Sequence, residues 1–224
     1  MTSDLYGIYG ASGFGREVLP ILRDQLCQQG ISEDRLVFVD DNPPAPMLNG
    51  RRVVTYAEYL AESANSRYIT LAIANSDVRA LLAAKCAADR LQFIDVRANN
   101  IVVMDDVIMG EGSILTPFVT LTSNIRIGHH FHANIYSYVA HDCVIGDFVT
   151  LAPAVKCNGN VIIENHAYLG TGVIIKQGRP GRPITIGERA VVGAGAVVTK
   201  NVPAGVTVFG NPASILSKEN LRRK

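Results

Sequence analysis

One histidine of the chain has a carboxylate as its immediate neighbour: His141 precedes Asp142 in the segment YVAHDCVIGDF. Imidazole titrates near neutrality, and an adjacent carboxylate raises its proton affinity and helps to fix its orientation. The pair therefore suits a general base that removes a proton from an attacking amine. The alternative is a solvated histidine at a corner of the chain, and the residue types alone favour that alternative.

A second set of candidate residues lies near the N-terminus. The segment GASGFG, residues 10–15, follows the apolar run LYGIY; Asp40 and Asp41 end the run LVFVDD; and Asn75 ends the run YITLAIAN. Glycines let the backbone approach a ligand closely, and the N-terminus of a following helix attracts an anion. This pattern predicts a phosphate-type loop with an acid that contacts a ribose or base. A plain strand-to-helix turn is the alternative, because Ser12 stands where a glycine is usual.

These residues require a small α/β domain to position them. We predict strands at 5–9, 36–41, 68–75 and 91–96, and helices from about 16 to 29 and from about 76 to 90, in the order β-α-β-β-α-β. The carboxyl ends of parallel strands share one edge of a sheet, so the candidate residues should gather there. Only about 95 residues precede the next region, which is half a classical dinucleotide fold. We therefore expect a substrate's nucleotide moiety rather than a nicotinamide cofactor.

The second half of the chain has a period of six. Every sixth residue from Val103 to Ile175 is apolar, thirteen in succession, and a second apolar column two residues earlier is broken only by Ser113 and Ser137. With about half the residues apolar, chance gives such a run with a probability on the order of one in ten thousand. We predict a parallel β-helix in which three six-residue sides form one eighteen-residue coil.

Small and polar residues mark the corners of the predicted coils. Gly110, Gly128, Gly146 and Gly170 directly follow the main apolar column. We expect these glycines to adopt the backbone angles that a sharp bend requires. After Ile175 the period resumes at Ile186, so five extra residues, 179–183 with the sequence RPGRP, should project as a loop.

All five histidines lie in the repeat region: His129, His130, His132, His141 and His166. Trimeric β-helices can assemble three-histidine zinc sites, and the run HHFH raises that possibility. Residues on one side of successive coils differ by eighteen, and no two of these histidines do. We therefore predict no metal site, with zinc held between neighbouring subunits as the alternative.

Composition limits the class of protein. Basic and acidic residues nearly cancel, at 21 against 20, so the net charge predicts neither a nucleic-acid nor a membrane-surface partner. The first residues show no basic region followed by an apolar stretch, so we do not expect export, and no apolar run reaches the roughly 18 residues of a membrane-span candidate. We expect a cytoplasmic protein with reduced cysteines. The expected division is a nucleotide-sugar-binding domain at 1–97, a β-helix at 98–215 and a charged tail at 216–224.

Three groups of motifs, spread over essentially the whole chain, carry a resemblance to a known family. They are IYGASGFG with FVDD and AIAN, HDCVIGDFV with KCNGNV, and VVGAGAVVTKNV with GNPA. These motifs resemble those of bacterial nucleotide-amino-sugar N-acetyltransferases, the sialic-acid O-acetyltransferase-like group that makes bacillosamine and perosamine derivatives. The resemblance implies a Rossmann-like half-domain joined to a left-handed parallel β-helix of hexapeptide repeats, and a homotrimer. It also implies acetyl transfer from acetyl-CoA to a nucleotide-linked 4-amino-4,6-dideoxy sugar used in surface glycans.

The resemblance assigns roles to individual residues. It implies that His141 is the general base and Asp142 its acidic partner. It places the nucleotide at Ser12, Gly13, Phe14, Asp40 and Asp41, and near Ala74 and Asn75. It places acetyl-CoA between two subunits, at Gly159, Thr171, Gly193 and Ala194. Acetyl-CoA is expected as a co-substrate, with no tightly bound cofactor and no metal.

Two other functions remain open from the sequence. The same base would serve O-acetylation of a sialic-acid-like hydroxyl, and a trimer that binds nucleotide sugars without catalysis is also compatible with the two domains. Arg179 and Arg182 of the inserted loop either hold the phosphates of CoA or are solvated. Neither the nucleotide (UDP, GDP or dTDP) nor the position of the amine on the sugar follows from the residues.

Overall fold

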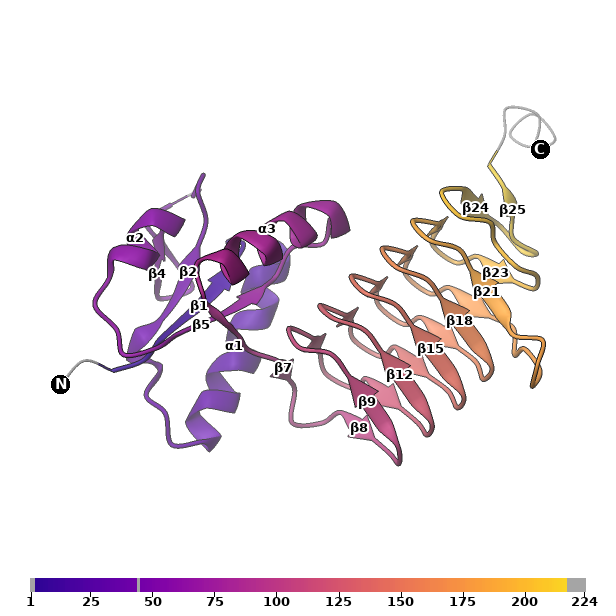
Figure 1. Cartoon of the computed structure of the whole chain (residues 1–224), viewed down its shortest axis with the longest axis horizontal. Coiled ribbons are helices and arrows are strands. Elements are labelled where there is room, and N and C mark those ends of the chain that lie inside the picture. The colour runs from indigo at the N-terminus through magenta and orange to yellow at the C-terminus, as the bar shows by residue number, and fades with distance from the viewer. Residues whose placement is uncertain (1–2, 44, 217–224) are drawn as a thin grey trace. The chain divides into compact units, whose positions relative to one another are not determined.

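A computed structural model describes residues 3–43 and 45–216 of the chain, and they form two compact units (Figure 1). The first unit comprises the described residues up to Asn99 together with Glu111–Ile114. The second comprises Asn100–Gly110 and the described residues from Leu115 onward. Of the predicted charged tail, only Leu216 lies within the described residues.

The first unit is built on a six-stranded sheet in the order β3-β4-β2-β1-β5-β6. Its strands are β1 (Leu5–Tyr9), β2 (Leu36–Val39), β3 (Met47–Leu48), β4 (Arg51–Val54), β5 (Arg67–Leu71) and β6 (Gln92–Phe93). Its helices are α1 (Gly13–Gln28), α2 (Tyr56–Ala61), α3 (Ser76–Ala88) and the 3-10 turn Glu33–Arg35. Only β3 runs antiparallel, against β4. The parallel strands therefore direct their carboxyl ends to one edge, as the sequence predicts.

Both faces of this sheet are covered because side chains alternate along each strand. Ile8 of β1 belongs to a buried cluster with Leu22 and Leu26 of α1. On the opposite face, the ring of Tyr59 from α2 lies so close to Gly7 that a Cβ there would come within 2.9 Å of it. The tyrosine hydroxyl also donates to the carbonyl of Tyr68 at 2.7 Å, which fastens α2 onto β5.

The predicted element order is wrong in the region between the second and third strands. A short hairpin, β3 with β4, and the helix α2 intervene there, and β4 extends the parallel sheet beside β2. The sequence pattern misses β4 because two of its four residues are Arg51 and Arg52, so no apolar run marks it. The third strand also ends at Leu71 rather than at Asn75, because Asn75 caps α3 instead.

The second unit is a parallel β-helix with three strand ladders. One ladder contains β10 (Ile114–Leu115), β13 (His132–Ala133), β16 (Thr150–Leu151), β19 (Tyr168–Leu169), β22 (Val191–Val192), β24 (Thr207–Phe209) and the antiparallel β25 (Ser214–Ile215). The second contains β8 (Val102–Val103), β11 (Thr120–Leu121), β14 (Tyr138–Val139), β17 (Lys156–Cys157), β20 (Ile174–Ile175) and β23 (Val197–Val198). The third contains β9 (Val107–Met109), β12 (Ile125–Ile127), β15 (Cys143–Ile145), β18 (Val161–Ile163) and β21 (Ile184–Ile186).

Strand pairing confirms the eighteen-residue coil. Leu121 pairs with Val139, and Val139 pairs with Cys157. From Leu115 to Ile175 the main apolar column is buried throughout. Ser137, one of the two serines in the second column, is also buried, and its hydroxyl donates to the carbonyl of Ala152 at 2.9 Å. The prediction is wrong only at the start of the column, where Val103 is 43% exposed because β8 ends its ladder.

The predicted role of the corner glycines is wrong. Gly110, Gly128, Gly146 and Gly170 do not have positive φ. They are needed because successive coils approach closely: a Cβ on Gly170 would lie 2.7 Å from the backbone nitrogen of Ala194. The left-handed corner positions are instead filled mainly by larger residues, including Asn124, Asp142, Asn160, His130, Phe148 and His166.

The predicted loop at residues 179–183 is present. Arg179 and Arg182 exchange two backbone hydrogen bonds, of 3.1 and 2.8 Å, which close the loop on itself. Beyond the loop, Ile184 pairs with Val161, a separation of 23 residues rather than eighteen. The five extra residues therefore leave the ladder intact. None of the described helices is long and apolar enough to cross a membrane. All four cysteines are free thiols.

Candidate active site

His141 and Asp142 lie at the corner between β14 and β15, and the structure joins their side chains. The Nδ1 atom of His141 is 2.7 Å from an Oδ2 atom of Asp142. An ionised carboxylate can only accept a hydrogen bond, so Nδ1 carries the proton. In the neutral ring the lone pair is then on Nε2. Each side chain is 47% exposed, so the imidazole is accessible from solvent.

Asp142 is held firmly in this arrangement. Its backbone is in the left-handed region, with φ of 58°, and its N–H donates to the carbonyl of Ser123 at 3.1 Å. The amide of Asn124, one coil earlier, donates to the other carboxylate oxygen at 3.2 Å. The hydrogen bond from His141, with that from Asn124 in support, holds the pKa of the Asp142 carboxyl below its ordinary value. Asp142 therefore stays ionised as the partner of the imidazole.

Gly159 occupies the same corner one coil later, and the imidazole lies directly over it. A Cβ at residue 159 would come within 2.6 Å of both Nε2 and Cε1 of His141. The absence of a side chain thus makes the space in which the ring sits. The residue before Gly159 is held by two hydrogen bonds: Tyr138 donates to Asn158 at 2.9 Å, and Asn158 donates to the carbonyl of Ile175 at 2.7 Å.

The other residues assigned to acetyl-CoA lie at a different corner. Thr171 and Ala194 are exposed and close together, because Gly195 donates its N–H to the carbonyl of Thr171 at 2.8 Å. Gly193 is buried against the ring of Phe209. The structure therefore places Gly159 next to His141. Thr171, Gly193 and Ala194 form a separate group at another corner.

A stack of rings forms at a third corner, and the sequence spacing did not indicate it. The ring of Phe148 lies between those of His130 and His166, with centroid distances of 5.1 Å on either side. His130 and His166 are two coils apart in the sequence, so a search for histidines separated by eighteen residues does not find that they share a corner. In the part of the chain that the structure describes, no group of three or more His, Cys, Asp or Glu side chains is placed to hold a metal ion.

The residues assigned to the nucleotide gather at the carboxyl edge of the first sheet. Ser12 and Gly13 are exposed at the start of α1, and Phe14 is partly buried. Asp40 joins this loop to the end of β2, because its Oδ2 accepts the N–H of Ala11 at 2.9 Å. The other oxygen of Asp40 accepts the N–H of Asn42 at 3.0 Å. Asp40 therefore shapes the loop that the sequence predicts as phosphate-binding.

Asp41 is the centre of a separate network at this edge. Its carboxylate accepts the hydroxyl of Tyr9 and the N–H of Tyr56, both at 2.8 Å, and lies 3.6 Å from the ammonium of Lys85. Burial raises the pKa of Asp41, but these two hydrogen bonds and the nearby charge outweigh it and leave the pKa below its ordinary value. Lys85 also lies 3.9 Å above the ring of Tyr56. Both Asp41 oxygens therefore already have protein partners.

The third loop of the edge is held by two side chains. Asn75 accepts the N–H groups of Asp77 and Val78 at 3.0 and 3.1 Å and so caps α3. The buried Arg79 donates to the carbonyl of Ala74 at 3.3 Å. Sequence reasoning misses Arg79, because an arginine on a helix is normally a surface residue. Its position four residues after Asn75 is the only signal.

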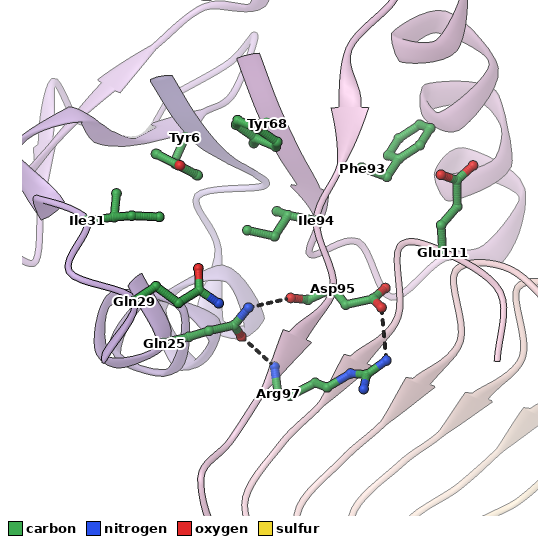
Figure 2. A pocket seen from close by; sticks show the side chains of 10 residues that line it. All are labelled: Tyr6, Gln25, Gln29, Ile31, Tyr68, Phe93, Ile94, Asp95, Arg97 and Glu111. Atoms are coloured by element: carbon green, nitrogen blue, oxygen red, sulfur yellow. Dashed lines mark hydrogen bonds and ion pairs between the residues drawn. The ribbon is translucent and has the colours of Figure 1, made fainter. Parts of the chain in front are cut away.

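A cavity of about 580 Å³ lies in the first unit, away from this edge (Figure 2). Tyr6 and Tyr68, the second residues of β1 and β5, stack with a centroid distance of 5.1 Å and line it. Below them, Gln25 bridges the carbonyl of Asp95 and the N–H of Arg97, each at 2.9 Å. None of these residues was predicted as a site residue, and the cavity is near the amino ends of the strands.

Comparison with known proteins identifies the family. Residues 7–86 match the PglD N-terminal domain. The chain is 50% identical, over 210 residues, to a GDP-perosamine N-acetyltransferase of Escherichia coli O157:H7, covering 94% of this chain and 95% of the relative. The chain belongs to the nucleotide-amino-sugar N-acetyltransferases. Members of this family are acyltransferases, so the predicted class of enzyme is confirmed.

Two solved structures support the same assignment. WeeI from Acinetobacter baumannii AYE is 55% identical, with a TM-score of 0.93 over 96% of this chain and 100% of that chain. PerB from Caulobacter crescentus, in complex with CoA and GDP-perosamine, is 25% identical, with a TM-score of 0.81 over 95% and 97% of the two chains. The predicted fold class, a Rossmann-like half-domain followed by a parallel β-helix, is confirmed for this member of the family.

Proposed function

We propose that the chain transfers the acetyl group of acetyl-CoA to the 4-amino group of GDP-perosamine. The supporting observation is the 50% identity, along almost the whole of both chains, to an enzyme named for this activity. The relative PerB was solved with CoA and GDP-perosamine together, which fits an enzyme that holds the nucleotide sugar and the coenzyme at the same time.

His141 is the general base in this proposal. The amine attacks the thioester carbonyl, the C–N bond forms, and Nε2 of His141 accepts the proton that the nitrogen loses. A backbone N–H stabilises the tetrahedral oxyanion that results. The oxyanion then collapses, the C–S bond breaks, and CoA leaves as the thiolate. Asp142 stabilises the imidazolium that forms. The reaction needs no covalent enzyme intermediate and no metal ion.

The two substrates bind to different parts of the chain in this proposal. The nucleotide lies at the carboxyl edge of the first sheet, against Ser12, Gly13 and Phe14, near Asp40 and Asp41, and beside Ala74 and Asn75. Acetyl-CoA lies along the coils at Gly159, Thr171, Gly193 and Ala194. We place it between two β-helices of a homotrimer, because Thr171 and Ala194 are exposed at a corner away from His141.

The decisive experiment is an acceptor panel with the purified full chain. GDP-perosamine, a UDP-linked 4-amino sugar, a dTDP-linked 4-amino sugar and a sialic acid are each mixed with acetyl-CoA, and release of free thiol is followed together with the mass of the sugar product. We expect thiol release and a singly acetylated product, with the highest kcat/KM for GDP-perosamine. Thiol release with the sialic acid alone would establish O-acetylation instead. Absence of release with every acceptor, despite CoA binding, would exclude catalysis.

A further inference from the structure

Arg79 is a buried cation in the first turn of α3. Its side chain is 0% exposed, although arginine is among the residues most rarely buried. Burial lowers the pKa of the guanidinium to about 9, so the group remains charged at neutral pH. Removing a charge from water costs free energy that its partners must return. The hydrogen bonds of Arg79 therefore indicate its structural role.

Those contacts are with the loop that joins β5 to α3. The Nη1 atom donates to the carbonyl of Ile73 at 2.6 Å and to that of Ala74 at 3.3 Å. The only cis peptide bond among the described residues is Asn211–Pro212, so both peptide groups in the loop are trans. In a trans peptide the C=O and N–H bonds point in opposite directions. When these two carbonyls turn toward Arg79, the N–H groups of Ala74 and Asn75 must point away from it.

These two N–H groups lie at the edge where the candidate nucleotide residues gather. The neighbouring loop is close, because a Cβ on Gly10 would come within 2.9 Å of the carbonyl of Ala72. Within the part of the chain that the structure describes, neither the N–H of Ala74 nor that of Asn75 donates a hydrogen bond. The side chain of Asn75 is occupied in capping α3. The loop thus presents two backbone N–H donors whose peptide groups are oriented by the hydrogen bonds from Arg79.

We propose that Arg79 is a positioning residue that orients the N–H groups of Ala74 and Asn75 as a pair of hydrogen-bond donors for the nucleoside diphosphate part of the substrate. The inference rests on the proposed function in that it takes the nucleotide to bind at this edge. Acceptor oxygens of a base or a phosphate match two fixed N–H donors. The buried positive charge favours the same anionic ligand without touching it.

The test compares Arg79→Met and Arg79→Lys with Arg67→Met in the full chain. Arg67 is a matched control because its guanidinium also bonds two backbone carbonyls, those of Tyr59 and Glu62, but it is the first residue of β5 and lies at the other end of the strand. Affinity for GDP is measured by titration calorimetry, and for acetyl-CoA in parallel. KM for the nucleotide sugar, kcat and the melting temperature complete the set.

We expect Arg79→Met to raise the Kd for GDP and the KM for the sugar about tenfold or more, the effect of about one lost hydrogen bond to a charged group. Its kcat at saturating sugar and its Kd for acetyl-CoA should stay within about twofold of wild type. Arg79→Lys should be intermediate, because an ammonium keeps the positive charge but cannot reproduce the position of the Nη1 atom that bonds both carbonyls. Arg67→Met should leave the Kd for GDP unchanged, whatever its effect on the melting temperature.

An unchanged Kd for GDP in folded Arg79→Met, or an equal loss in Arg67→Met, would overturn the inference. If Arg79→Met does not fold, amide NMR of the wild-type chain decides: GDP should shift the signals of Ala74 and Asn75, and unshifted signals would refute the proposal. Acetyl transfer is scored separately. If Arg79→Met binds GDP more weakly but the wild-type chain transfers no acetyl group, the proposed function is rejected and the role of Arg79 in nucleotide binding is retained.

Discussion

At the scale of single residues, the proposed chemistry depends on one hydrogen bond, which joins the side chains of the sequence neighbours His141 and Asp142. Side chains of adjacent residues usually diverge, but the left-handed backbone of Asp142 turns its carboxylate back to the Nδ1 atom of His141. That bond selects the tautomer with a basic Nε2. Asn124 from the preceding coil fixes the carboxylate. The proposed catalytic unit is therefore a pair of side chains supported by the amide of Asn124.

Replacing His141 by Asn should lower kcat by two orders of magnitude or more, because an amide cannot accept a proton at neutral pH. The Kd for acetyl-CoA should be unchanged. Both are measured by thiol release and calorimetry on the purified variant. His129→Asn is the matched control, since His129 is also an exposed histidine at a corner of the β-helix and should retain full activity. Wild-type turnover in His141→Asn would remove this residue from the base role.

At the scale of elements, coils of the β-helix stack so closely that the effect of adding a side chain at a glycine depends on which atoms that glycine faces. The three atoms nearest to a Cβ added at Gly159 all belong to the imidazole of His141, whereas those nearest to a Cβ at Gly170 are backbone atoms of the next coil. A methyl group at residue 159 can displace a side chain, whereas one at residue 170 must separate two coils. The same chemical change should therefore affect catalysis at one position and folding at the other.

We expect Gly159→Ala to lower kcat at least tenfold, by an estimate of about 1.4 kcal/mol or more for the misplaced base, with a melting temperature within a few degrees of wild type. Gly170→Ala should instead lower the melting temperature by roughly 4 °C or more, as expected for an overpacked contact. Steady-state kinetics and thermal unfolding of the two variants make the comparison. Full activity in Gly159→Ala would show that the ring does not require the space over this glycine.

The inserted loop leaves and rejoins the β-helix beside two consecutive residues of the preceding coil, Gly159 and Asn160. Gly178 donates to the carbonyl of Gly159 at 2.9 Å, and Ile184 donates to that of Asn160 at 3.2 Å. Adjacent residues in an uninterrupted coil would make the same two bonds. Deletion of residues 179–183 should therefore change the melting temperature by only a few degrees. Thermal unfolding measures this, and a collapse of the fold would contradict the expectation that the loop is external to the ladder.

At the scale of the whole molecule, the proposed trimer would complete the acetyl-CoA site. The chain has two units, and the residues assigned to acetyl-CoA belong to the β-helix, whereas those assigned to the nucleotide belong to the first unit. Assembly should therefore govern acetyl-CoA binding more than nucleotide binding. Closed symmetric oligomers are the common solution for such a shared site.

Light scattering after size-exclusion chromatography should give about three times the chain mass of 24.1 kDa. Dilution that dissociates the oligomer should lower acetyl-CoA affinity in step with the trimer fraction, because half of each site would be lost. The Kd for GDP, measured in the same dilution series, serves as the control and should change little. A monomeric mass with full activity would exclude a site that is shared between subunits.

The period of six and the adjacency of His141 and Asp142 are both local patterns, and the sequence alone was sufficient to predict the β-helix, its inserted loop and the contact between these two side chains. The glycine loop and the acids at the strand ends likewise follow from short-range signals. Only the tertiary structure shows that Gly159 makes room for the imidazole, that the corner glycines serve contact between coils, and that Arg79 is buried behind the β5–α3 loop. These features depend on which residues meet across coils or between a helix and a sheet, and no short window of sequence carries that information.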